Sequence, residues 1–178
     1  INLSARQFSD PDLIKDIQTA IAEHDISPTH LEIEVTESLL ANDIKHAIEL
    51  LKEMQSMGLT IAIDDFGTGY SSLSYLKQLP LDKLKVDRAF VMDIPGNNDD
   101  KLITTAIIAM AHSLNLKVVA EGIETNEQMA FLQSLNCEIG QGYLYNKPLS
   151  PQVFEKHPII AGSFSRREST QENKDNEY

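Results

Sequence analysis

The sequence predicts an α/β fold built from parallel strand–helix units. Short β-rich runs alternate with longer segments whose apolar residues recur at helical spacing, and six candidate strand ends follow this rhythm. The candidate strands are apolar rather than alternating in polarity, which indicates that both faces of the sheet are covered. Polar residues gather where the strands end, which is the functional edge of parallel β/α folds. The pattern leaves a doubly wound open sheet and a β/α barrel as close alternatives.

The expected strands are short segments at residues 1–4, 31–36, 59–63, 84–86, 118–120 and 138–143. Between them lie expected helices at residues 10–21, 43–57, 72–79 and 101–114. Gly58 stands where a helix C-terminus favours a left-handed residue. A further helix begins at a capping box formed by Thr125 and Gln128, and a last short one begins at Ser150 and Pro151.

Composition limits the class of protein. The 178 residues fit one ordinary domain and are short for a closed eight-stranded barrel, which takes about 250. Apolar residues make up 42% of the chain, enough for a real core, but no apolar run approaches the length of a membrane span. The first residues do not resemble a signal peptide, and the single cysteine, Cys137, cannot form an internal disulfide. A cytoplasmic location is therefore expected.

The formal net charge of −12 argues against non-specific binding to DNA or RNA, which needs a basic surface. Solubility explains most of the negative surplus. The rest is consistent with a carboxylate cluster that holds metal ions, whose positive charge would let an anionic substrate approach.

Eight polar residues lie at or near the six strand ends: Asn2, Glu34, Asp64, Asp65, Lys85, Asp87, Glu121 and Gln141. A single carboxylate in such a place is usually a helix cap or an ion-pair partner. Carboxylates at four strand ends are harder to explain in that way, because unpaired buried negative charge is costly and divalent cations are the simplest compensation. The donors are all oxygen atoms, which favours Mg²⁺ or Mn²⁺ over Zn²⁺.

Two such metals would suit the hydrolysis of a phosphodiester. Lys85 can then position the attacking water or stabilise transition-state charge. The alternative for Lys85 is a plain ion pair with Asp64 or Asp87.

The segment after the paired aspartates, residues 65–72, contains glycines at positions 67 and 69, which indicates unusual backbone angles or close approach of a ligand. Its Asp-Phe-Gly run is also found in protein kinases, but the other kinase motifs are absent from the sequence. The glycine spacing does not match a dinucleotide fingerprint either. The five histidines lack the paired spacing of metal ligands, so surface or core roles are expected for them.

Taken together, six motifs resemble those of the EAL family of domains in order and spacing. They are Asn2-Leu3-Ser4, Glu34-Val35-Thr36-Glu37, Asp64-Asp65-Phe66-Gly67-Thr68-Gly69, Lys85-Val86-Asp87, Glu121-Gly122-Ile123-Glu124 and Gln141-Gly142-Tyr143. The resemblance covers about residues 1 to 155. It implies a modified (β/α)8 TIM-like barrel that hydrolyses the bacterial second messenger cyclic di-GMP to linear pGpG with Mg²⁺ or Mn²⁺. It also implies a homodimer, and fusion to sensory or GGDEF domains.

The resemblance further implies a role for each matching residue. Asn2, Glu34 and Asp64 resemble ligands of a first metal, and Asp65 resembles a ligand of a second. Lys85 resembles the lysine that orients the catalytic water, Glu121 a metal partner and general base, and Gln141 a residue that contacts water or substrate. Glu124 resembles a glutamate that anchors the loop containing Phe66, Gly67, Thr68 and Gly69.

The sequence departs from the family's pattern in one respect. The Glu-Ala-Leu motif, with a metal-binding glutamate and a nearby arginine, would precede Asn2 and does not occur in the chain. We therefore expect residues 1–158 to form an EAL barrel that lacks its first strands and helices. Residues 159–178 are expected to be a polar, disordered tail.

Two function classes follow from this departure. The intact carboxylates favour a phosphodiesterase in a longer parent protein, which could be anchored to a membrane through an N-terminal region, whereas the chain alone is expected to be inactive. The alternative is a catalytically inactive EAL-type module that binds cyclic di-GMP or regulates another protein.

Overall fold

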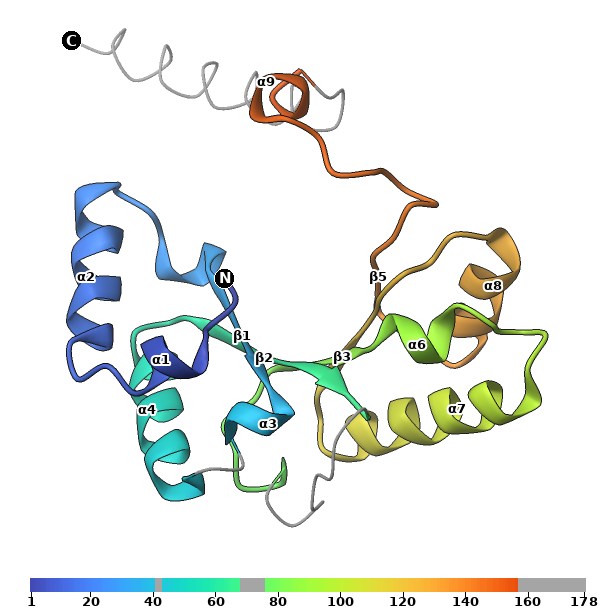
Figure 1. Ribbon diagram of the computed structural model, residues 1–178, viewed down its shortest axis with the longest axis horizontal. Helices are drawn as coiled ribbons and strands as arrows, with labels where there is room; N and C mark the ends of the chain where they lie inside the picture. The colour runs from blue at the N-terminus through green and yellow to red at the C-terminus, as the bar shows by residue number, and fades with distance from the viewer. Residues whose placement is uncertain (41–42, 68–75, 157–178) are drawn as a thin grey trace, which may run out of the picture. The chain divides into compact units, whose positions relative to one another are not determined.

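The structure is a computed structural model that describes residues 1–40, 43–67 and 76–156. It divides into two units, Ile1–Leu144 and Tyr145–Tyr178. The first unit holds every strand that the structure describes (Figure 1). The described part of the second unit contains one short helix, α9 (Pro151–Phe154), which begins after Ser150 as predicted.

The strands are β1 (Glu32–Thr36), β2 (Thr60–Phe66), β3 (Lys83–Val86), β4 (Lys117–Ala120) and β5 (Ile139–Gly140). The helices of the first unit are α1 (Ala5–Phe8), α2 (Leu13–Glu23), the 3-10 helix η1 (Pro28–His30), α3 (Glu37–Leu40), α4 (Ile44–Ser56), α6 (Arg88–Val91), α7 (Asn98–Ser113) and α8 (Asn126–Ser134). Within the described ranges, no helix combines the length and apolarity needed to cross a bilayer.

The longer helices confirm the predictions made from periodicity and capping. Helices α2, α4, α7 and α8 lie where they were expected, and Gly58 after α4 has a φ of +91°. The side chains of Thr125 and Gln128 form the predicted capping box of α8. The four-residue helices α1, α3 and α6 are too short for a periodic signal, and the helix expected at 72–79 lies mostly outside the described residues.

All five strands are parallel and follow one another in the order β1-β2-β3-β4-β5. A doubly wound sheet reverses direction at a switch point, so its first strand has later strands on both sides. The uninterrupted order is that of a β/α barrel wall, and it favours the barrel over the open sheet.

The first predicted strand is reduced to a single parallel bridge between Asn2 and Glu34. Its hydrogen bonds run from the Glu34 amide to the Ile1 carbonyl (2.8 Å) and from the Leu3 amide to the Glu34 carbonyl (3.0 Å). The bridge places the backbone of Asn2 directly beside Glu34.

The two faces of the sheet differ in polarity. Helix α4 packs on β2, and α7 packs on β3 and β4, over strand side chains that are almost fully buried. Side chains alternate along a strand, so the residues between these point to the opposite, inner face. In β1 and β3 the inner residues are charged, and the expectation of wholly apolar strands is wrong for these two. These charged side chains of β1 and β3 form ion pairs with one another across the inner face.

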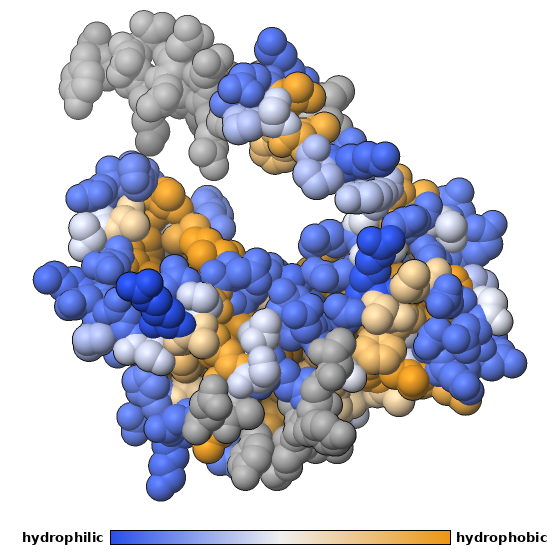
Figure 2. Space-filling model, viewed as in Figure 1, coloured by the Kyte–Doolittle hydropathy of each residue, from blue (hydrophilic) through white to orange (hydrophobic). Residues whose placement is uncertain are grey.

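An apolar groove of about 320 Å³ lies between α2 and the β1 edge, where apolar residues show in Figure 2. Its lining includes Leu3, Leu13, Ile17, Ile21 and Ile33. With so apolar a lining, the groove offers little for polar chemistry, whereas the inner face of the strands is rich in ionisable groups.

The packing makes a prediction about stability. Leu51 of α4 is fully buried in the core, so Leu51→Ala should lower the free energy of unfolding by about 2–5 kcal/mol. Leu102 is 69% exposed, and Leu102→Ala should change the free energy of unfolding by no more than about 0.5 kcal/mol. Urea denaturation of both variants would test this, and equal effects would contradict the placement of α4 against the sheet.

Candidate functional site

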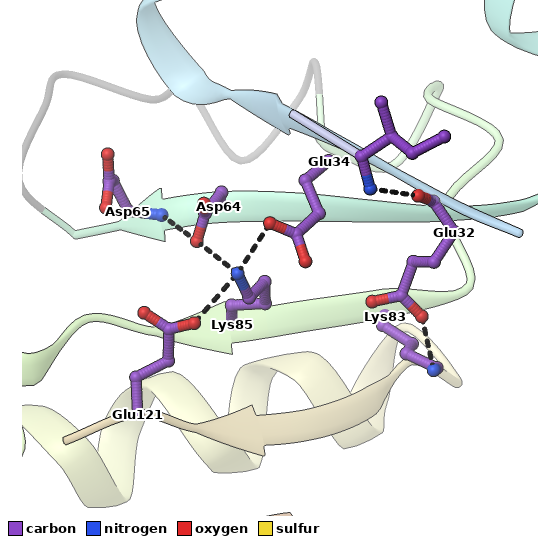
Figure 3. Close-up of polar contacts among 8 residues, drawn as sticks. Glu32, Glu34, Asp64, Asp65, Lys83, Lys85 and Glu121 are labelled. Carbon is purple, nitrogen blue, oxygen red and sulfur yellow. Dashed lines mark hydrogen bonds and ion pairs between the residues drawn. The ribbon is translucent and has the colours of Figure 1, made fainter. Parts of the chain in front are cut away.

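The centre of the site is the ammonium group of Lys85, the third residue of β3. It lies 2.8 Å from Glu121 Oε1, 2.9 Å from Glu34 Oε2 and 3.0 Å from Asp64 Oδ1 (Figure 3). The Lys85 side chain is only 5% exposed, and the carboxylates are between 13% and 19% exposed. Four of the residues predicted from the sequence therefore meet at one point.

Register explains why residues from separate strands converge. Glu34 pairs with Ala62 in β1 and β2, and Lys85 pairs with Val119 in β3 and β4. The small side chain of Ala62 allows groups from β1 and β3 to meet across β2. Two residues earlier on the same strands, Glu32 of β1 and Lys83 of β3 also form an ion pair across β2 (Figure 3).

The electrostatics of the cluster are unequal. Burial disfavours the Lys85 ammonium, but hydrogen bonds to Glu121, Glu34 and Asp64 outweigh that effect and raise its pKa above the ordinary value. For Glu121, burial raises the pKa, the bond to Lys85 lowers it, and the charges of Asp64 and Glu34 raise it further, so the net direction is upward. The Lys85 ammonium is thus stabilised by three carboxylates at once. Each carboxylate shares this one positive charge with the other two carboxylates and is repelled by them.

Asp65 reaches the same edge through an irregularity in β2. Consecutive strand residues point to opposite faces, so Asp64 and Asp65 would normally diverge. The pairing of β2 with β3 shifts between Ile63 and Phe66, and Asp65 has a φ of +53°. Such a bulge with a left-handed residue re-aims a side chain, and aspartate tolerates that conformation better than most residues.

Asp87 is the neighbour of Asp65; the sequence placed it among the polar residues at the strand ends, but no metal or catalytic role was predicted for it. Burial, the charge of Asp64 and a hydrogen bond with Asp87 raise the pKa of Asp65. Asp87 also caps α6, where one carboxylate oxygen accepts from the Ala89 amide at 2.7 Å. Its place directly after β3, two residues beyond Lys85, was the signal that could have predicted such a role.

Glu37 is a second residue that sequence reasoning missed. Its side chain is buried, and Oε2 accepts a hydrogen bond from the Gly67 amide at 3.4 Å. Its Oε1 is buried without a hydrogen-bond partner among the described residues. Glu37 therefore connects β1 to the start of the loop that follows Asp65.

The remaining predicted residues lie around this centre. Glu124 forms an ion pair with Arg88 at 2.9 Å, and Gln141 follows β5, with its amide bonded to the Ala120 carbonyl. In the described part of the chain, the Gln141 side chain makes no recorded contact with the Lys85 cluster. Phe66 is buried at the end of β2, and Gly67 has a φ of +99°, whereas Thr68 and Gly69 lie outside the described residues.

The histidines take no part in the cluster that the structure describes. His46 packs edge-on against Phe8, and His112 lies 3.3 Å from Glu138. Both roles are structural, as expected for these two residues.

The oxygen donors around Lys85 match the ligand chemistry of a divalent metal. Carboxylate and amide oxygens are the ligands that Mg²⁺ and Mn²⁺ prefer, and Asn2, Glu34 and Asp64 supply them. Over residues 1–40, 43–67 and 76–156, no three acidic, histidine or cysteine side chains are arranged to hold a metal, and the Lys85 ammonium lies between the carboxylates instead. The residues fit a divalent cation in chemistry, provided that Lys85 gives up part of its contacts.

The pKa of Glu121 makes a prediction about stability without divalent metal. A raised folded-state pKa means that Glu121 stabilises the fold below its unfolded pKa of about 4.3, and that this contribution is lost as the pH rises through the folded pKa. Glu121→Gln should therefore raise the melting temperature at pH 7, and by less at pH 4. Thermal unfolding in the presence of a chelator would measure the difference.

Glu138 is the matched control with the opposite sign. Burial opposes its ionisation, but hydrogen bonds from the amides of Val118 and Glu138 and from His112 lower its pKa. That stabilisation is present above the unfolded pKa and is lost as the pH falls through the folded pKa. Glu138→Gln should lower the melting temperature at pH 7. If Glu121→Gln also lowered the melting temperature at pH 7, that result would contradict the repulsion among the carboxylates.

Known proteins share both the sequence and the fold of the chain. Residues 1–148 match the EAL domain. Among curated relatives, the cyclic di-GMP phosphodiesterase NbdA of Pseudomonas aeruginosa is 47% identical over 156 residues, which cover 88% of this chain and 20% of that protein. The bifunctional diguanylate cyclase/cyclic di-GMP phosphodiesterase MucR of the same species is 46% identical over 149 residues, 84% of this chain and 22% of that protein. The chain thus spans about a fifth of the length of these relatives.

Solved structures agree with this assignment. The PaMucR phosphodiesterase in complex with c-di-GMP has a TM-score of 0.82 at 44% identity, covering 86% of this chain and 62% of that one. The manganese/cy-diGMP complex of Klebsiella pneumoniae BlrP1 has a TM-score of 0.76 at 34% identity, covering 83% of this chain and 38% of that one. These similarities confirm the predicted fold class, and the chain belongs to the EAL domain family.

Proposed function

We propose that this chain is the larger part of a cyclic di-GMP phosphodiesterase domain, which hydrolyses cyclic di-GMP to linear pGpG. The observation that carries the proposal is the meeting of Glu34, Asp64 and Glu121 around Lys85. The NbdA and MucR relatives, which are named for this activity, support the same conclusion.

The reaction adds water to one phosphorus atom and breaks one of its ester bonds. Asn2, Glu34 and Asp64 would hold a first Mg²⁺ or Mn²⁺ ion, and Asp65 with Asp87 would hold a second. When bound, such ions acidify a water and neutralise charge on the phosphate oxygens. The manganese complex of BlrP1 supports this choice of ion.

The chain's own residues supply positioning and proton transfer. Lys85, once partly released by Glu34 and Asp64, can hold the attacking water through its ammonium N–H groups. Glu121 has a raised pKa, which makes it a better proton acceptor than an ordinary carboxylate. Gln141 follows the neighbouring strand and would contact the water or the substrate.

Two glutamates would anchor the loop that contains Phe66, Gly67, Thr68 and Gly69. Glu37 accepts from the Gly67 amide and would hold the loop at its start. Glu124 would be the second anchor, as its match to the family's loop-anchoring glutamate implies.

We further propose that the chain works in the cytoplasm, as a homodimer and as one domain of a longer signalling protein. The name of MucR, which combines a cyclase with a phosphodiesterase, supports the fusion to a GGDEF domain.

A substitution in the full-length protein tests the proposed function. Asp64→Asn removes one ligand charge, and it should lower kcat/KM for cyclic di-GMP by about a hundredfold or more, because metal charge supplies several kcal/mol of transition-state stabilisation. Chromatography of pGpG at low Mn²⁺ concentration would measure this. The matched control is Asp82→Asn, because Asp82 lies before β3, at the opposite end of the strands, where it accepts from the Ile61 amide at 2.8 Å.

Asp82→Asn should keep turnover within about threefold of wild type, since it retains an acceptor oxygen for that amide. Wild-type turnover by Asp64→Asn would contradict the site. If the wild-type protein binds cyclic di-GMP tightly but forms no pGpG, the result would favour the alternative function, a catalytically inactive binding or regulatory module.

A further inference from the structure

A buried glutamine holds the segment that follows β4. Gln128, in the first turn of α8, is 3% exposed. Its Oε1 accepts from the amides of Glu124 at 2.7 Å and Thr125 at 3.0 Å. A capping box requires only the second of these bonds, so the Gln128 side chain does more than cap its helix.

The other end of the same amide reaches a different element. Gln128 Nε2 donates to the Met92 carbonyl at 3.0 Å. Met92 is the C-cap of α6, the short helix whose N-cap is Asp87. One side chain therefore connects the segment after β4, which begins with Glu121, to the segment after β3, which begins with Asp87.

The segment between Glu121 and Gln128 has little room to move. Gly122 has a φ of +69°, and a Cβ atom there would lie 2.3 Å from Arg88 Cγ. A Cβ atom on Gly142 would lie 2.1 Å from the Ile123 carbonyl oxygen, and Ile123 itself is 2% exposed. Close packing limits the sideways movement of the segment, and the Gln128 bonds fix its far end.

Glu121 is where this rigidity matters. Its amide donates to the Val86 carbonyl at 3.1 Å, and its carboxylate lies 2.8 Å from Lys85. The Glu121 side chain is 19% exposed, so a small shift of the segment would let the carboxylate turn away from Lys85 toward solvent. A tether at the end of the segment would oppose such a shift.

We propose that Gln128 is a positioning residue of the phosphodiesterase site, which acts through the segment Glu121–Thr125 to hold the Glu121 carboxylate in register with Lys85 and Asp87. The inference rests on the proposed function. All of its recorded side-chain hydrogen bonds are to backbone groups, so Gln128 works by geometry and not by contact with the reacting atoms.

The test compares two nearly isosteric substitutions in the full-length protein. Gln128→Met removes the tether and keeps the side chain's length. The control is Thr104→Val, because Thr104 is fully buried and its hydroxyl donates to the Phe90 carbonyl of α6 at 3.0 Å. Thr104 also ties a neighbouring helix to α6, but it has no bond to the segment after Glu121.

Gln128→Met should lower kcat for cyclic di-GMP by about tenfold to a hundredfold with KM within about twofold, since small misplacements near a reacting group have costs of this size. Thr104→Val should keep kcat within about threefold despite its lost hydrogen bond. An equal loss of kcat in both variants, or no loss in Gln128→Met, would overturn the proposal.

Amide hydrogen exchange separates this proposal from the proposed function. Exchange at the Glu121 amide should be faster in Gln128→Met and unchanged in Thr104→Val, whether or not the wild-type protein hydrolyses cyclic di-GMP. If the wild type lacks turnover, the proposed function fails, and faster exchange confined to Gln128→Met still supports the tether. Unchanged exchange at Glu121 in Gln128→Met would refute the tether.

Discussion

One ammonium group surrounded by three carboxylates is the interaction on which the site depends. Glu34, Asp64 and Glu121 belong to three different strands or strand ends. Within the described ranges, the Lys85 ammonium is the cation that contacts all three and offsets their mutual repulsion. Buried carboxylates without a cation would be protonated or would move into solvent. Lys85 thus holds three carboxylates together, and the negative charge that exceeds its single positive charge suits the cluster to bind a further cation.

The parallel sheet provides the geometry for this interaction. Strand ends meet at one edge, and the alternation of side chains separates an apolar face, covered by α4 and α7, from a charged inner face. The pairing of Glu32 with Lys83 one layer below continues the same polar face. Asp65, which follows Asp64 directly, has a left-handed backbone conformation, and such strain is common at functional sites. Among the described residues, Glu37 Oε1 is buried without a hydrogen-bond partner.

The sequence was a good guide to those features that leave a periodic or positional signal. Amphipathic spacing and caps located α2, α4, α7 and α8, and polar residues in or at the ends of the strands located Glu34, Asp64, Lys85 and Glu121. Pattern alone could not choose between a barrel and an open sheet, because strand order is a property of tertiary pairing. Resemblance to a family supplied that choice.

Other features depended on contacts that sequence spacing does not encode. The bulge that aims Asp65 arises from pairing with β3, and the hydrogen bond from the Gly67 amide to Glu37 joins residues far apart in the sequence. The alternation of charged residues in β1 and β3 was missed, because these short strands were interpreted as apolar and charged residues on a strand usually face solvent. The tether by Gln128 was predicted only as a helix cap, because Met92 lies far away in the sequence.

The central claim is that the carboxylates which now hold Lys85 are the ones that hold metal. Anomalous diffraction at the manganese edge, from crystals of the full-length protein with Mn²⁺ and cyclic di-GMP, tests it most directly. The account predicts a manganese peak within bonding distance of the Glu34 and Asp64 carboxylates, with the Lys85 ammonium moved away from at least one of them. A manganese ion bound elsewhere, with Lys85 still in contact with all three carboxylates, would contradict it.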